Sequence, residues 1–296
     1  MDLSTAQDIR YGSTSVSAVY LGNQKIWPTS HDYSLDYLTL TALGSGNVIL
    51  QCAGNGTNSS FSKTIEYSYD GSNWTTITAE YGSSKSIPVS SNDKVYFKGL
   101  NNTYSYNAST AYYNYFCIRA DVNHIISGNI MSMFYGDNFV GQTTFPSSSY
   151  NLFHFFTNNT YLIDVSNLVL PVTTLMNGCY YGMFMGCTSL TTTPEIPATT
   201  LTEKCYMAMF HGCTSLETAP YLPAITLVNS CYDSMFTGCT SLNYVKAAFT
   251  TEPTLSYTNS WLFNVSSTGT FVKSQSATWT NTGSDSVPVG WTIETF

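Results

Sequence analysis

Six of the eight cysteines in this 296-residue chain recur at one fixed interval, which makes them the first candidates for chemistry. They lie in three copies of a phrase, "CYYGMFMGCTSL", "CYMAMFHGCTSL" and "CYDSMFTGCTSL", that begin at Cys179, Cys205 and Cys231. Thiolates could bind zinc or pair as disulfides, but each copy holds C-x7-C without a C-x2-C pair, and the histidines follow no ligand spacing. Stacked cysteines would also point their Cβ atoms in parallel. We predict that they pack, with disulfides and metal as the alternatives.

Other catalytic signatures are missing from the sequence. It contains no G-x-S-x-G elbow, no H-E-x-x-H and no phosphate-binding loop. Paired carboxylates for glycoside hydrolysis would leave no motif, because their separation is set in three dimensions. We expect no catalytic residue, no metal site and no cofactor.

The constant interval of 26 residues between the copies predicts the stacked coils of a solenoid. In each coil Leu190 or its equivalent begins a strand, and an apolar stripe at i, i+3 and i+4 predicts a short helix. Gly212 stands where a left-handed residue would end that helix. The phrase "NYVKAAF" (residues 243–249) closes the series. We therefore predict a solenoid over residues 123–249, with a strand and a short helix per coil, and a C-terminal cap over residues 250–296.

The repeated phrase resembles the BspA-like leucine-rich repeats that are abundant in surface proteins of gut Bacteroidetes and in their phages. The resemblance rests on "MFMGCTSL" (residues 183–190) followed by "PATTL" (residues 197–201). It extends to flanking segments at residues 127–145, 265–273 and 287–293. The resemblance implies a mainly β solenoid and a function in adhesion or recognition. It does not imply a catalytic activity.

Upstream of the repeats, residues 31–122 alternate apolar and polar side chains, as in "YLTLTAL" and "DKVYFKG". A period of two with turn residues between the runs predicts an antiparallel β-sandwich. The segment "YSYNASTAYYNY" (residues 104–115) sets tyrosines among small polar residues, and exposed aromatic faces can stack on sugars. Packing along a strand and cover of a neighbouring subunit are the alternatives. The candidate glycan-binding residues are Tyr104, Tyr106, Tyr112 and Tyr113.

The repeats also differ at positions predicted to face solvent, whereas their core positions stay fixed. Such variation predicts a partner surface, with ordinary solubility as the alternative explanation. The residues of this surface are Glu195, Glu217, Tyr221 and Tyr244.

Residues 1–30 are predicted to form a separate β-hairpin module. "VSAVYLGNQKIWP" (residues 16–28) predicts two strands around a Gly-Asn turn, ended by Pro28. A lone hairpin is marginally stable, so we expect it to dock on another protein or on its own sandwich. It resembles short N-terminal modules of virion proteins from Bacteroidetes phages, crAss-like phages included. The predicted attachment residues are Tyr20, Leu21, Ile26 and Trp27.

Composition narrows the class of protein. Only 9% of the residues are charged, the net charge is −8 and the ten basic residues are scattered, which argues against nucleic acid as a partner. The start lacks the pattern of an export signal, and no apolar run reaches the length of about 18 residues that a membrane span needs.

These features together favour a non-enzymatic virion structural protein, a capsid decoration or a head or tail fibre component. We expect it to be made in the host cytoplasm without membrane insertion and to reside on the virion surface. Other virion proteins are its expected partners, followed by a host-surface glycan or protein and further copies of the same chain. The alternative is a bacterial cell-surface adhesin whose export signal has been removed.

Overall fold

The computed structural model describes residues 10–11, 14–15, 19–21, 24–27, 32–55, 60–109, 112–147, 149–283 and 285–296. For residues 106–109 and 112 and for those before residue 32, only the backbone is described. The chain is mainly β, as predicted, and contains several sheets. It divides into two compact units, Met1–Tyr33 and Ser34–Phe296. Within the described ranges no helix has the length and apolar character needed to span a bilayer.

The N-terminal unit contains two pairs of short antiparallel strands. Its strands are β1 (Arg10–Tyr11), β2 (Thr14–Ser15), β3 (Val19–Leu21) and β4 (Gln24–Trp27). β1 pairs with β2, and β3 pairs with β4 through a register shift between Val19 and Tyr20. β3 and β4 coincide with the two strands predicted for residues 16–28, whereas the pair β1–β2 was not predicted. The short helix η1 (Tyr33–Leu35) follows.

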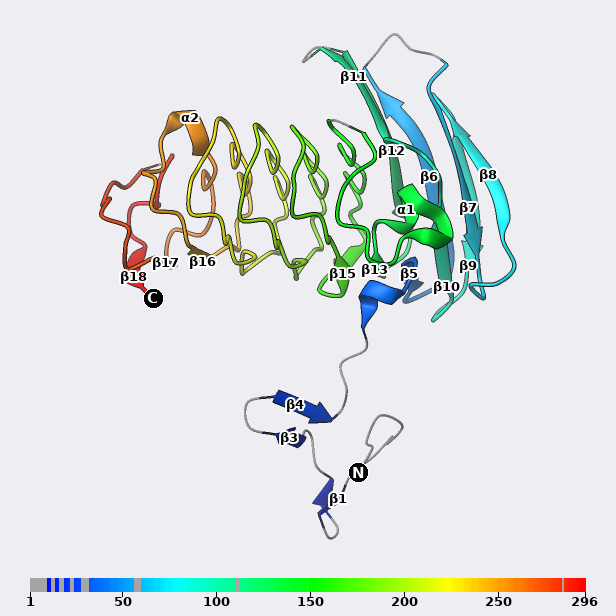
Figure 1. Cartoon of the computed structure of the whole chain (residues 1–296), viewed down its shortest axis with the longest axis horizontal. Helices are drawn as coiled ribbons and strands as arrows, with labels where there is room; N and C mark the ends of the chain where they lie inside the picture. The colour runs from blue at the N-terminus through cyan, green and yellow to red at the C-terminus, as the bar shows by residue number, and fades with distance from the viewer. Residues whose placement is uncertain are drawn as a thin grey trace. The chain divides into compact units, whose positions relative to one another are not determined.

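The larger unit begins with two layers of β-sheet (Figure 1). The strands are β5 (Leu38–Ala42), β6 (Gly46–Gly54), β7 (Ser62–Ser68), β8 (Thr75–Glu80), β9 (Ser84–Val89), β10 (Lys94–Lys98), β11 (Ser105–Ser109), β12 (Tyr112–Ala120) and β13 (His124–Asn129). One layer has the order β13-β5-β10-β7-β8 and the other has the order β11-β12-β6-β9. Alternate residues such as Leu38 and Leu40 in β5, and Val48 and Leu50 in β6, are fully buried. They alternate because successive side chains of a strand point to opposite faces.

β13 joins the two layers to the repeats. It pairs antiparallel with β5, and it pairs in parallel with β14 (Leu162–Asp164) and β15 (Leu168–Val169). The predicted boundary after residue 122 falls in the turn between β12 and β13, and the sheet that contains β5 continues through β13 into β14 and β15 on the other side of it.

The buried imidazole of His124 lies at this joint. Its Nδ1 lies 2.8 Å from the carbonyl oxygen of Val122, and its Nε2 lies 3.0 Å from the side-chain nitrogen of Asn159. Burial lowers the pKa of His124 to about 4, so the ring is neutral at physiological pH. The neutral tautomer that fits donates from Nδ1 to Val122 and accepts at Nε2 from Asn159.

The repeats stack through segments of consecutive tight turns, which we call the turn segments: residues 150–158, 178–186, 204–212 and 230–238. Figure 1 shows the coils side by side between the two β-layers and α2 (Leu255–Thr258), which follows the last turn segment and accepts hydrogen bonds from it at the carbonyls of Ser256 and Tyr257. Alternate N–H groups donate to the next turn segment, as Tyr206 does to the carbonyl of Cys231 (3.1 Å). The N–H groups between them close turns within their own segment, as Met207 does to Lys204 (3.2 Å).

The short helix predicted for each repeat is wrong. Every fourth residue of a turn segment has a positive φ, for example 57° at Lys204, 52° at Ala208 and 73° at Gly212. A left-handed residue every fourth position interrupts the right-handed α conformation, and half of the N–H groups bond to a neighbouring repeat. The left-handed conformation predicted for Gly212 is confirmed, but no helix precedes it. Among the described residues the other helices are α1 (Ser132–Tyr135) and η2 (Gly136–Asn138).

The other half of each repeat contains fewer strands than predicted. Between β15 and β16 (Tyr244–Ala247), the described residues make isolated bridges, such as Thr174 with Thr200, instead of ladders. The prolines of "PEIPATTL" and "PYLPAITL" explain this, because proline has no N–H to donate to a ladder. β16 has no proline, and it pairs in parallel with β17 (Thr270–Lys273), which pairs with β18 (Thr292–Thr295).

The core of the stacked repeats is built from columns of identical side chains. The Phe184 and Phe210 rings stack at 5.4 Å, and the Tyr180 and Tyr206 rings stack at 5.6 Å. Residues 250–296 cover the end of these columns, where Trp261 is fully buried against the ring of Tyr232 (6.3 Å). Equivalent residues lie one above another because the repeat length is constant.

Candidate recognition surface

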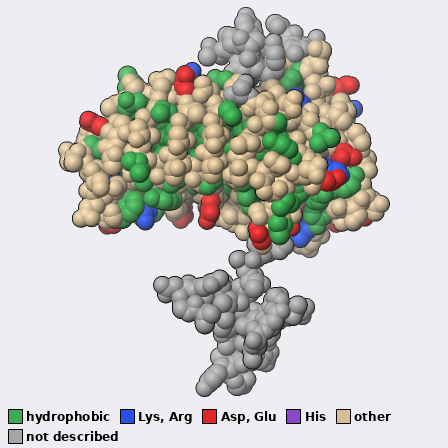
Figure 2. Space-filling model, in the orientation of Figure 1, with side chains coloured by type: hydrophobic (Ala, Val, Ile, Leu, Met, Phe, Trp, Pro, Cys, Tyr) green, Lys and Arg blue, Asp and Glu red, His purple; other side chains and the backbone are tan. Residues whose placement is uncertain are grey.

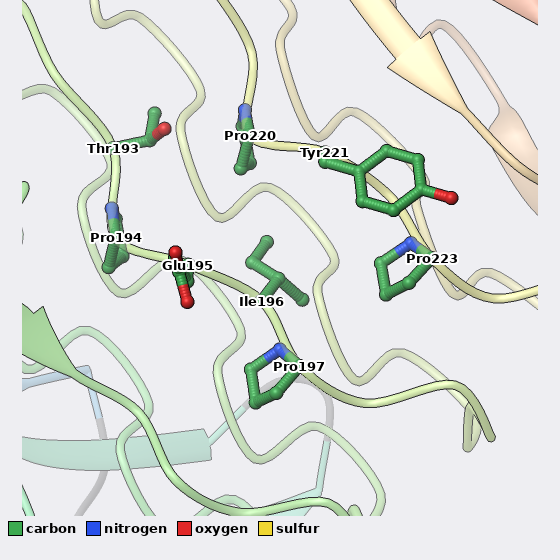
Figure 3. Close-up of a pocket in the computed structure, with 8 residues that line it drawn as sticks. All are labelled: Thr193, Pro194, Glu195, Ile196, Pro197, Pro220, Tyr221 and Pro223. Atoms are coloured by element: carbon green, nitrogen blue, oxygen red, sulfur yellow. The ribbon is translucent and has the colours of Figure 1, made fainter. Parts of the chain in front are cut away.

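A groove of about 410 Å³ opens between two successive repeats on their proline-containing side. One wall comes from residues 193–197 and the other from residues 220–223 (Figure 3). The lining is largely proline and isoleucine, with one tyrosine ring, one carboxylate and one hydroxyl. The residues that line it are Thr193, Pro194, Glu195, Ile196, Pro197, Pro220, Tyr221 and Pro223. We call this feature the proline groove.

Two of the predicted surface residues, Glu195 and Tyr221, line the proline groove, one on each wall, and the Tyr221 ring extends away from Glu195 (Figure 3). They occupy equivalent positions of successive repeats, and both are exposed, with 46% of the Tyr221 side chain open to solvent. Their neighbours Ile196 and Leu222 are buried, so the alternation that fills the core also turns Glu195 and Tyr221 outward. A ring on one wall can contact the apolar face of a sugar, and a carboxylate on the other wall can accept hydrogen bonds from sugar hydroxyls.

Two residues that the sequence analysis missed extend this surface. The Lys246 ammonium lies 5.5 Å from the centroid of the Tyr221 ring and 4.1 Å from that of Phe296. The Tyr221 and Phe296 rings are 6.0 Å apart and nearly perpendicular. The alternation in "NYVKAAF" indicates that the Lys246 side chain points to solvent. No sequence pattern indicates that Phe296 lies next to Tyr221.

Glu217 and Tyr244 are also exposed, and they lie next to each other in the backbone. The N–H of Tyr244 donates to the carbonyl of Glu217 at 3.3 Å. Neither residue lines the proline groove. Of the four residues predicted to form a partner surface, Glu195 and Tyr221 therefore line the groove. Glu217 and Tyr244 lie next to each other outside it.

Of the four tyrosines predicted to contact a glycan, the structure contradicts one, Tyr104. Tyr104 is fully buried among aromatic rings, and its hydroxyl donates to the carbonyl of Met133 at 2.5 Å, so the prediction that it contacts a glycan is wrong. Tyr113 is half-buried and packs 5.1 Å from the Phe153 ring. Tyr106 and Tyr112 lie on β11 and β12, and their side chains fall outside the described residues, as do those of Tyr20, Leu21, Ile26 and Trp27.

The cysteines lie in the described part of the chain, where all eight are buried and free of disulfides. The thiols of Cys187 and Cys213 donate to carbonyl oxygens of a preceding repeat at 3.2 Å. Burial raises the pKa of the Cys179 and Cys187 thiols to about 12, which opposes the thiolate form that nucleophiles and metal ligands require. Within the described ranges no three His, Cys, Asp or Glu side chains are grouped to hold a metal ion.

Figure 2 shows one face of the molecule, on which charged side chains are sparse among uncharged polar and apolar ones. A surface of this kind favours contacts through rings, hydroxyls and a few placed charges. Comparison of the chain with protein-family models, with curated proteins and with solved structures yielded no match.

Proposed function

We propose that this chain is a non-enzymatic phage virion protein, a capsid decoration or a head or tail fibre component, that contacts a glycan of the host surface through the proline groove. In this proposal the stacked repeats are a BspA-like leucine-rich-repeat solenoid. The 26-residue period and the alternate N–H groups that bond from repeat to repeat support that assignment.

The proline groove is the observation that carries the proposal. It places an exposed ring, a carboxylate and a hydroxyl on a rigid wall of prolines, at positions where successive repeats differ. Core residues on both sides are fully buried, so the groove is held by the stack and does not depend on a mobile loop. The thiols are buried and protonated, and Glu195 is the one charged residue among those that line the groove, which supports binding over catalysis.

The proposed contact is tested by binding of labelled protein to cells of the bacterial host. Tyr221→Ser should weaken binding at least about fivefold, because an aromatic stacking contact contributes about 1 kcal/mol beyond its buried area. Tyr161→Ser is the matched control, since Tyr161 is also 46% exposed and lies outside the proline groove. Equal binding by both variants would contradict the proposed role of the groove.

The proposed location is tested by mass spectrometry of purified particles. The chain should be present in particles, and deletion of residues 1–30 should abolish its incorporation, because the separate N-terminal unit is the proposed attachment module. Finding the chain in the bacterial envelope and not in particles would overturn the virion assignment in favour of the surface adhesin.

A further inference from the structure

Four lysines of the described residues lie over aromatic rings, and Lys246 is the one among them that faces two rings; Lys63, 5.2 Å from the Phe61 ring centroid, faces one and likewise has no ion pair with a described residue. Lys98 lies 4.2 Å from the Trp74 ring centroid and also bonds the carboxylate of Asp137 at 2.9 Å. Lys273 is buried and donates to the carbonyl oxygen of Trp279. Lys246 faces two rings, and no acidic side chain among the described residues lies within ion-pair distance of it.

The fold fixes Lys246 beside the proline groove. Val245 and Ala247 of β16 are buried, so the side chain of Lys246 between them points outward. The carbonyl of Lys246 accepts the N–H of Leu222 at 3.1 Å, which places it next to Tyr221. The outward-facing line across three successive repeats is therefore Glu195, Tyr221 and Lys246, of which Lys246 is half-buried.

The position of Phe296 completes an aromatic frame around the ammonium. The N–H of Phe296 donates to the carbonyl of Lys273 at 3.1 Å, so β17 anchors the end of the chain. Two ring faces attract an ammonium but leave N–H donors of Lys246 for a further acceptor. A carboxylate is the acceptor that already completes the equivalent arrangement at Lys98.

Among the described residues no carboxylate lies within 4.0 Å of the Lys246 ammonium, Glu217 on the neighbouring repeat included. Glu195 is two repeats away, roughly 10 Å along the stack, which is about one Debye length at physiological salt. Glu294 is likewise two strands away, because Lys246 aligns with Val272 and Val272 aligns with Glu294. Both charges are exposed and screened by solvent at that separation.

We propose that Tyr221, Lys246 and Phe296 bind a carboxylate-bearing sugar of the hexuronic acid class, as part of an acidic glycan. The Tyr221 ring contacts the apolar face of the sugar, and the Lys246 ammonium pairs with its carboxylate. This inference rests on the proposed function and specifies the glycan that the proline groove selects.

The test is calorimetric titration of the full chain with an oligogalacturonate and with the same oligomer after reduction of its carboxyl groups. Wild type should bind the acidic oligomer about tenfold more tightly than the reduced one, which is about 1.4 kcal/mol, and Lys246→Gln should abolish that difference because it removes the charge that pairs with the carboxylate. Lys94→Gln, at an exposed lysine of β10, is the matched control and should leave the difference unchanged. Melting curves of both variants verify that they fold.

The outcomes separate this inference from the proposed function. Equal affinity for the two oligomers, or a preference that survives Lys246→Gln, overturns the acidic-sugar site. If host-cell binding by the same wild-type sample still depends on Tyr221, the proposed function stands without it. If wild type binds neither oligomer and does not bind host cells, both fail.

Discussion

The hydroxyl groups of two buried tyrosines should affect stability in opposite directions. Tyr104 and Tyr232 are both fully buried. The Tyr104 hydroxyl donates to the carbonyl of Met133 at 2.5 Å and accepts from the side-chain nitrogen of Asn101 at 3.1 Å. The Tyr232 hydroxyl has no hydrogen-bond partner among the described residues. Substitution by phenylalanine removes each hydroxyl and keeps each ring.

The expected magnitudes follow from these contacts. Tyr104→Phe leaves the buried carbonyl of Met133 without its donor, which should lower the free energy of unfolding by about 1–3 kcal/mol. Tyr232→Phe removes a hydroxyl that was desolvated without compensation, which should raise the free energy of unfolding by about 1 kcal/mol. The ring of Tyr232 stays stacked between Tyr206 and Trp261, since phenylalanine stacks equally well.

Urea unfolding followed by circular dichroism is the assay. The midpoint should fall for Tyr104→Phe and rise for Tyr232→Phe at an unchanged slope. Tyr161→Phe, at an exposed position, should leave the midpoint unchanged. A loss of stability in Tyr232→Phe as large as that in Tyr104→Phe would refute the reasoning, because it would mean that the Tyr232 hydroxyl is bonded in the folded protein.

Two further predictions concern the backbone and the pH dependence of stability. Gly212→Val should lower the free energy of unfolding by about 2 kcal/mol. Gly212 has a φ of 73°, and the nearest atom to an added Cβ would be the Gly186 Cα at an ordinary contact distance of 3.8 Å. The loss of stability therefore comes from backbone strain and not from a steric clash. An unchanged urea midpoint would contradict this prediction. Burial lowers the pKa of His124 and His154 from 6.5 to about 4, so only the unfolded chain binds these protons in that window. The free energy of unfolding should therefore fall by about 3 kcal/mol for each imidazole as the pH drops from about 6.5 to about 4. Melting temperatures that do not change across this pH range would show that the two rings are not held neutral in the folded protein.

The local pattern predicted the core of the repeats but not their backbone conformation. Identical cysteines and aromatic residues at a constant interval predict which side chains lie inward, and the structure buries them. The apolar stripe at i, i+3 and i+4 is compatible with a helix and equally compatible with a series of turns. Hydrogen bonds to the next repeat, such as that from the N–H of Tyr206 to the carbonyl of Cys231, favour the turns over a helix. The sequence of one repeat considered alone does not reveal these bonds.

For the candidate recognition surface too, some features could be predicted from the sequence and others could not. The sequence by itself determined the mainly β class, the interval of the stack and the outward positions of Glu195 and Tyr221, because alternation and repetition are properties of neighbouring residues. Only the tertiary structure decided that Tyr104 is buried, and that Lys246 and Phe296 flank Tyr221. Burial and side-chain contact depend on which distant segments pack together, and residues 221, 246 and 296 become neighbours only because β16, β17 and β18 align in one parallel sheet beside the last proline-containing repeat.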